Sequence, residues 1–198
     1  MLDALNPRHH KAMSQGKAIS PSVKMKIHGL TLMEVMVTVA IMAILLVLAV
    51  PSFNSFLARG RLTGAAEALV QDLQLAKSEA LRSNADVTIS FSPVGAWCYG
   101  AVVSTTACDC TDQVPPCSLR RVDSTAYSGV TMDATSFTGN ATTFSARLGM
   151  ASPGWVDLTH PNAGTLRVSV GEAGQTTPSS QVRICSTSGG LGHHPACP

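Results

Sequence analysis

The segment from Leu30 to Val50 reads LTLMEVMVTVAIMAILLVLAV, twenty-one residues with one charged side chain, Glu34. At about 1.5 Å of rise per residue, a helix of this length spans the roughly 30 Å hydrocarbon core of a bilayer. A secretory signal has a shorter apolar core, about 7 to 15 residues, followed by a small-residue cleavage site. The nearest small residues, Ala58 and Gly60, lie beyond Pro51 and fit that template poorly. We therefore expect a transmembrane helix here.

The positive charge of the chain is concentrated before this segment. Residues 1–29 hold five Lys and Arg and one acid, Asp3, so nine of the 14 basic and eleven of the 12 acidic residues follow. Because Lys and Arg mark cytoplasmic flanks, the N-terminus is expected in the cytoplasm, with everything after Val50 across the membrane. The small net charge of +2 then gives no argument for a nucleic-acid partner.

The overall composition excludes two classes of protein. With 198 residues, the chain suits one domain, or one domain with an appendage, rather than a multidomain enzyme. Hydrophobic residues make up 45% and charged residues 13%, which is too apolar for a disordered chain.

The position of Glu34 is informative because an ionisable group costs roughly 2.5 to 3.5 kcal/mol at the centre of a membrane span, and less near its ends. It stands five residues after Gly29, in the string KIHGLTLMEVMV. This string resembles the class III signal peptide of type IV pilins and pseudopilins, which usually reads Gly, Phe, Thr, Leu, an aliphatic residue and Glu. Here Leu30 stands in place of Phe, and Met33 in place of the common Ile.

The resemblance implies a maturation and an assembly step. A prepilin peptidase would cut between Gly29 and Leu30, remove residues 1–29 as a cytoplasmic leader, and N-methylate Leu30. The carboxylate of Glu34 would pair with the terminal amine of a neighbouring subunit, which offsets the cost of burying both charges. Leaders in this family are often short, so Met25 would begin a complete one; Met1, Met13 and Met25 all stay open as the start.

The residues after Pro51 continue a helical pattern. Apolar side chains recur at steps of three or four, with charged residues between them, which predicts an amphipathic helix over residues 51–84. Pro51 removes one backbone hydrogen bond, so we expect a kink there and no termination. The apolar positions are Leu62, Ala66, Leu69, Leu73, Ala76 and Ala80.

Residues 85–198 read as a β-rich head. Short alternating runs separated by Pro and Gly predict antiparallel strands. One long helix whose amphipathic half covers a small antiparallel sheet gives an α+β fold; the resemblance to type IV pilins implies that this fold is pilin-like. The predicted strands lie around Val87 to Phe91, from Trp97, at Leu119 and Val122, over Thr142 to Arg147, over Trp155 to Leu158, over Leu166 to Val170, and at Val182 and Ile184.

Three stretches carry the resemblance beyond the signal peptide. They are RLTGAAEALVQDLQLAKSEALRSNADVTISF from Arg61, WCYG from Trp97, and TTFSARLGM from Thr142. They look like the GspH/FimT branch of pilins and pseudopilins, over about residues 59–170.

All six cysteines follow the membrane segment: Cys98, Cys108, Cys110, Cys117, Cys185 and Cys197. Their even number and the oxidising compartment implied by the topology favour disulfides. We expect Cys185 to pair with Cys197, since they bracket the glycine-rich tail and pilins often staple a C-terminal loop. The other four would tie down the loop from Cys98 to Cys117, with their partners left open.

Catalytic and metal chemistry find little support. The CDC and HHPAC strings contain zinc-ligand types, but CxC is not the usual CxxC and free thiols would oxidise. No Ser, His and Asp set stands out by spacing. We expect no enzyme, metal or cofactor.

Some FimT-like minor pilins bind DNA through a C-terminal Gly-Arg-x-Arg motif, which this chain lacks. Weak phosphate contacts would fall to a surface patch of arginines, although ordinary solvated side chains are the favoured interpretation. The candidates are Arg120, Arg121, Arg147, Arg167 and Arg183.

The leading hypothesis is a minor type IV pilin of the FimT/FimU kind, which primes fibre assembly or lies at the tip. Its partners would be other pilins and the prepilin peptidase. It would sit in the bacterial inner membrane with a periplasmic head, and then in the fibre. The alternatives are a GspH-like pseudopilin of type II secretion and a DNA-binding competence pilin.

Overall fold

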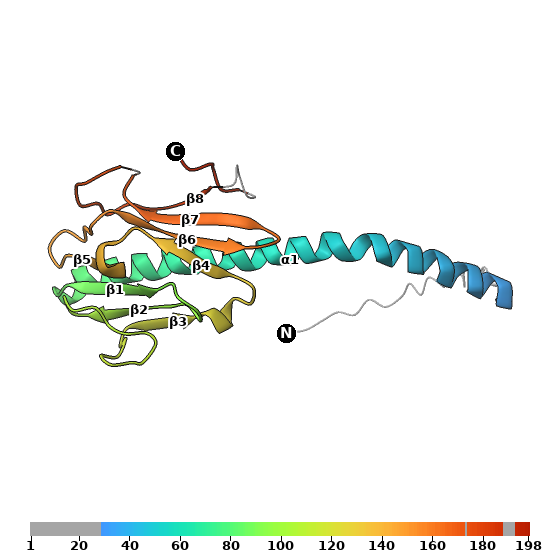
Figure 1. Ribbon diagram of the computed structural model, residues 1–198, viewed down its shortest axis with the longest axis horizontal. Helices are drawn as coiled ribbons and strands as arrows, with labels where there is room; N and C mark the ends of the chain where they lie inside the picture. Colours follow the sequence, from blue (N-terminus) through green and yellow to red (C-terminus); the bar gives the residue numbers. More distant parts are fainter. Residues whose placement is uncertain (1–28, 173, 188–192) are drawn as a thin grey trace, which may run out of the picture. The chain divides into compact units, whose positions relative to one another are not determined.

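The computed structural model describes residues 29–172, 174–187 and 193–198 (Figure 1). The chain divides into two compact units, Met1–Met42 and Ala43–Pro198. One helix, α1 (Leu32–Ser83), precedes all the strands. The strands are β1 (Val87–Ser92), β2 (Cys98–Val103), β3 (Arg120–Asp123), β4 (Thr131–Thr135), β5 (Ala141–Phe144), β6 (Gly154–His160), β7 (Gly164–Val170) and β8 (Val182–Ser186), with short 3-10 helices at Ser124–Ala126 and Thr138–Asn140.

Helix α1 confirms the predicted long helix and begins two residues later than expected. Its 52 residues continue through Pro51 without a break. It ends where Asn84 takes a left-handed conformation with φ of 49°, a backbone geometry that commonly closes helices. The expected kink at Pro51 stays a prediction.

The second half of α1 supplies one wall of the core. All six predicted apolar positions, from Leu62 to Ala80, are at most 1% exposed. They belong to one buried cluster with strand residues such as Ile89 and Phe144 from one sheet and Leu158 and Leu166 from the other. The amphipathic pattern therefore identified the packed face of the helix correctly.

The strands form two four-stranded antiparallel sheets, in the orders β3-β2-β1-β5 and β4-β6-β7-β8. The α+β class is confirmed, but the expected single sheet is a pair, and both lie against the second half of α1 (Figure 1). The strand predicted up to Arg147 ends at Phe144, because Ser145 and Gly149 close a turn by a backbone hydrogen bond.

Strand β4 was absent from the predictions. Its sequence, TMDAT, places one fully buried apolar side chain, Met132, between exposed polar residues, and a bulge interrupts its pairing with β6. A strand this short and irregular leaves little period-two signal.

A buried polar group links α1 to the first sheet. Asp72, only 7% exposed, accepts a hydrogen bond from the Tyr99 hydroxyl at 2.8 Å and one from Arg120 Nε at 3.1 Å. Burial, followed by the Asp72 charge, raises the pKa of Tyr99, and the hydrogen bond to Asp72 raises the pKa of Arg120. The carboxylate thus fixes the helix against β2 and β3.

Candidate assembly site

The N-terminus of α1 is formed by local hydrogen bonds. Thr31 precedes the first helical residue, and its Oγ1 accepts from the Glu34 backbone N–H at 3.2 Å. The Thr31 carbonyl accepts from the Val35 N–H, also at 3.2 Å. Thr followed three residues later by Glu is the sequence of a capping box, and a carboxylate in the first turn interacts favourably with the helix dipole. The motif residues therefore also start the helix.

The expected cleavage position lies outside the helix. Gly29 and Leu30 are non-helical and exposed, with Leu30 at 74%. No atom lies within 4 Å of the place where a Cβ on Gly29 would stand. The rest of the predicted leader, residues 1–28, lies outside the described residues.

The first half of α1 has an exposed apolar surface. Every large apolar side chain from Leu30 to Val47 is between 46% and 78% exposed. By length and composition this helix can span a membrane. The helix presents Glu34 as the one charged residue of that surface, and no described cation forms an ion pair with it. The segment therefore has apolar area and a carboxylate that its own described residues do not cover.

All six cysteines are paired in the structure. Cys185 joins Cys197, the pair expected from the sequence. The other two bonds, which the sequence left open, are Cys98–Cys110 and Cys108–Cys117. The loop between β2 and β3 is therefore stapled twice.

Gly100 on β2 is required by this loop. A Cβ at Gly100 would lie 2.2 Å from Cys117 Sγ and 2.7 Å from Cys117 Cβ, which no real contact allows. The WCYG string identified from the sequence thus combines a disulfide cysteine with the glycine that makes room for the second disulfide.

Four of the five candidate DNA-contacting arginines are held by acids. Arg120 pairs with Asp72, Arg121 with Asp123, Arg167 with Asp157 and Arg183 with Glu172. Arg147 is exposed in the turn after β5. Because their charge is largely neutralised, these side chains do not form a strongly basic patch.

Metal ligands are not gathered anywhere in the described residues: no three His, Cys, Asp or Glu side chains lie close enough to hold an ion. His160 is buried at the end of β6, and its Nδ1 accepts from the Asn162 N–H at 3.2 Å. His193 and His194 lie in the C-terminal segment.

Three functional features escaped the sequence reasoning. The capping role of Thr31 had a readable signal, Thr-x-x-Glu before an apolar run. The Asp72 link had none, because its partners Tyr99 and Arg120 are 27 and 48 residues away. The stacking of Arg167 on Trp155 likewise depends on the pairing of β6 with β7.

Comparison with known proteins gives two family matches. The prokaryotic N-terminal methylation motif matches residues 24–50, and the family described as type II transport protein GspH matches residues 65–190. A search of curated proteins found no match.

Two crystal structures of the Pseudomonas aeruginosa type IV minor pilin FimU are similar to this chain. The first is 20% identical and has a TM-score of 0.45; the aligned region covers 67% of this chain and 98% of the FimU chain. The second is 24% identical, covers 64% and 96%, and has a TM-score of 0.44. Since the GspH match covers more than half of the sequence and the methylation motif precedes it, the chain belongs to the GspH family of the type IV pilin and pseudopilin superfamily.

Proposed function

We propose that this chain is a structural subunit of a pilus-type fibre, and specifically a minor type IV pilin. The observation that carries the proposal is the exposed apolar half of α1 with Glu34 near its start. A surface of this size must lie in lipid or in a bundle of similar helices. Membrane anchoring before assembly and helix bundling afterwards provide both environments.

Cleavage of the leader creates the positively charged group with which Glu34 would pair. Cleavage between Gly29 and Leu30 removes the basic leader and creates a terminal amine on Leu30, four residues before the Glu34 carboxylate. Pairing between neighbouring subunits satisfies both charges in the apolar bundle and sets the register of the helices. N-methylation of Leu30 accompanies the cut.

The chain then passes through two locations. It is held in the bacterial inner membrane by residues 30–50, with the head in the periplasm, and later lies in the fibre. The disulfides of the head suit an oxidising compartment. Its role is structural rather than catalytic.

A pseudopilin of type II secretion is the second candidate, and the family description, type II transport protein, favours it. Deleting the gene separates the two. A pilin mutant loses surface fibres and twitching motility, whereas a pseudopilin mutant retains twitching and keeps its secreted enzymes inside the cell. Complementation with the intact gene is the control.

DNA binding has the least support, because four of the five candidate arginines are paired with acids. Retardation of duplex DNA by micromolar protein at low and moderate salt would support the third candidate, a DNA-binding competence pilin.

The assembly mechanism is tested by Glu34→Ala. We expect normal cleavage, since the substitution leaves Gly29, Leu30 and the backbone hydrogen bond of the Thr31 cap in place, but at least a tenfold loss of the subunit from sheared fibres. Mass spectrometry of the mature N-terminus and immunoblots of fibres measure the two steps. Met36→Ala, on the same exposed helix, is the matched control. Normal incorporation of Glu34→Ala would contradict the proposal, and an uncut, unmethylated chain would contradict the maturation step.

A further inference from the structure

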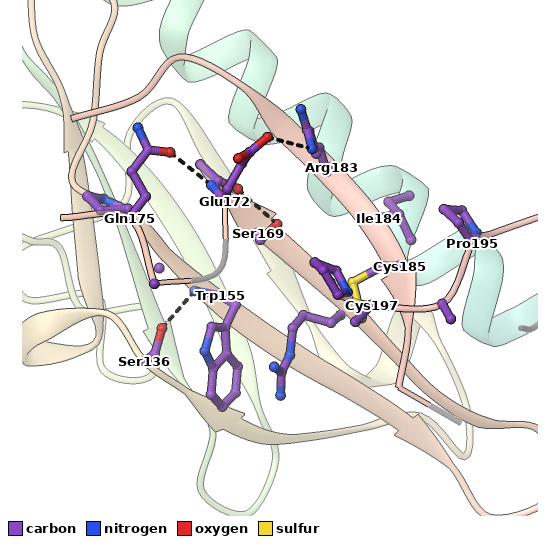
Figure 2. Close-up of a pocket in the computed structure, with 17 residues that line it drawn as sticks. Ser136, Trp155, Ser169, Glu172, Gln175, Arg183, Ile184, Cys185, Pro195 and Cys197 are labelled. Atoms are coloured by element: carbon purple, nitrogen blue, oxygen red, sulfur yellow. Dashed lines mark hydrogen bonds and ion pairs between the residues drawn. A yellow bond between two sulfur atoms is a disulfide. The ribbon is translucent and has the colours of Figure 1, made fainter. Parts of the chain in front are cut away.

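A cavity of about 550 Å³ lies on the outward face of the β4-β6-β7-β8 sheet (Figure 2). Trp155, Arg167 and Ser169 line it, on the side of the sheet opposite the buried residues of β6 and β7. The loop after β7 and the C-terminal segment border it. Its volume is within the range of small-molecule pockets, about 300 to 1,000 Å³.

The floor of this cavity is preorganised. Nε and Nη2 of Arg167 donate to the two carboxylate oxygens of Asp157 at 2.7 Å each. The guanidinium carbon lies 3.8 Å from the centroid of the Trp155 ring. The hydrogen bond to Asp157 raises the pKa of Arg167, so the stacked guanidinium stays protonated. The Asp157 carboxylate balances its positive charge. The arrangement holds the indole in place without leaving a free positive charge.

The disulfide Cys185–Cys197 fixes the C-terminal border. Around it the Ser186 N–H donates to the Pro195 carbonyl at 2.8 Å, and the Cys197 N–H donates to the Ser186 carbonyl at 3.0 Å. Pro195 and the disulfide therefore form a fixed, largely apolar wall facing the cavity.

A second part of the border offers paired polar groups. Glu172 Oε1 and Arg183 Nη1 are 3.1 Å apart, and their side chains are 62% and 54% exposed. The neighbouring Gln175 amide holds the loop by accepting from the Glu172 N–H at 3.0 Å. Figure 2 shows Glu172 and Arg183 on the same side of the cavity. This border presents acceptors and donors side by side, with no net charge.

We propose that this cavity binds an uncharged saccharide. A sugar hydroxyl both donates and accepts, so neighbouring hydroxyls engage the Glu172 carboxylate and the Arg183 guanidinium while that ion pair stays intact. The C–H faces of a sugar ring pack against Trp155 and the Pro195 wall. A phosphate would meet two arginines already neutralised and an exposed carboxylate, and a cation would meet Arg183. The inference is independent of how the chain assembles.

The two tryptophans of the chain allow a direct test. Trp97 is 2% exposed and donates to the Val130 carbonyl at 2.7 Å, so its indole signal serves as an internal reference for Trp155. The full chain, labelled with ¹⁵N-tryptophan in dodecylphosphocholine micelles, which contain no sugar, is titrated with maltose, lactose and diacetylchitobiose. We expect a saturable shift of the Trp155 signal with at least one disaccharide, at a Kd of about 1–10 mM.

A charge-neutral pair of variants checks the assignment. Glu172→Ala with Arg183→Ala removes the polar border, keeps Trp155 as reporter, and should weaken binding at least tenfold. Glu79→Ala with Arg82→Ala removes another ion pair, on α1 and away from the cavity, and should leave binding unchanged. An unshifted Trp155 signal with all three sugars, equal binding by both double variants, or tighter binding of inorganic phosphate or of a capped uncharged pentapeptide would overturn the proposal.

Discussion

The two halves of α1 differ in apolar content and have opposite surroundings. Between Leu30 and Val47 the apolar side chains cover the whole circumference of the helix and are exposed. From Ala58 to Ala80 most of them form a stripe that is buried against two sheets. The first half depends on other molecules for its burial, and the second half is stabilised by its own chain. One helix therefore stabilises the head at one end and, in the function proposed above, would serve assembly at the other.

A Leu→Ala substitution in each half of α1 should give the largest difference in the stability of the head. Leu69→Ala creates a cavity in the core, so the free energy of unfolding of the head should fall by about 2–5 kcal/mol. Leu46 is 62% exposed, so Leu46→Ala should lower the free energy of unfolding by less than about 0.5 kcal/mol. Urea denaturation in micelles, followed by tryptophan fluorescence, measures both. Equal losses in the two variants would mean that the first half also supports the head.

The second half of α1 is also held to the head by the buried Asp72 carboxylate. Asp72→Ala leaves the buried Tyr99 hydroxyl without its acceptor and should destabilise the head by about 2 kcal/mol. The contribution of Arg120 is discounted because its side chain is 49% exposed. Glu67→Ala, at an exposed position of the same helix, is the control and should be neutral in the same urea titration. A neutral Asp72→Ala would show that the link does not stabilise the head.

Removing the Thr31 cap should destabilise only the first turns of α1. Thr31→Ala removes the hydrogen bond to the Glu34 N–H and should destabilise the first turn by about 1 kcal/mol. Hydrogen exchange in the full chain should show about fivefold lower protection in the first turns, with the head unchanged. Thr31→Ser keeps the hydroxyl and should restore protection. Unchanged exchange in Thr31→Ala would show that the cap contributes nothing.

The smallest effect at neutral pH concerns Tyr99. Its pKa is raised in the folded head, first by burial, so the stabilisation is complete below the unfolded pKa of about 10. Above that pH only the unfolded chain loses the proton, and stability should fall by up to about 1.4 kcal/mol per pH unit. Urea titrations between pH 8 and 11 should therefore show a shallower decline for Tyr99→Phe. Parallel declines in the two proteins would contradict this assignment.

Sequence patterns predicted the features whose signals are local. A continuous apolar run, a carboxylate five residues after Gly29, and apolar residues at helical spacing are all read from neighbours in the chain. The pairing of Cys185 with Cys197 was expected because the two bracket one short tail and because pilins, which the chain resembles, often staple a C-terminal loop. Strand β4 was missed because it has one buried apolar residue and a bulge.

By itself, then, the amino-acid sequence determined the long helix, its apolar first half, its buried stripe and the motif at its start, because each depends on a period or spacing of a few residues. Only the tertiary structure decided the split into two sheets, the disulfides of the β2–β3 loop, the Asp72 link and the cavity beside Trp155. These depend on contacts between residues far apart in the chain, whose geometry no local pattern encodes.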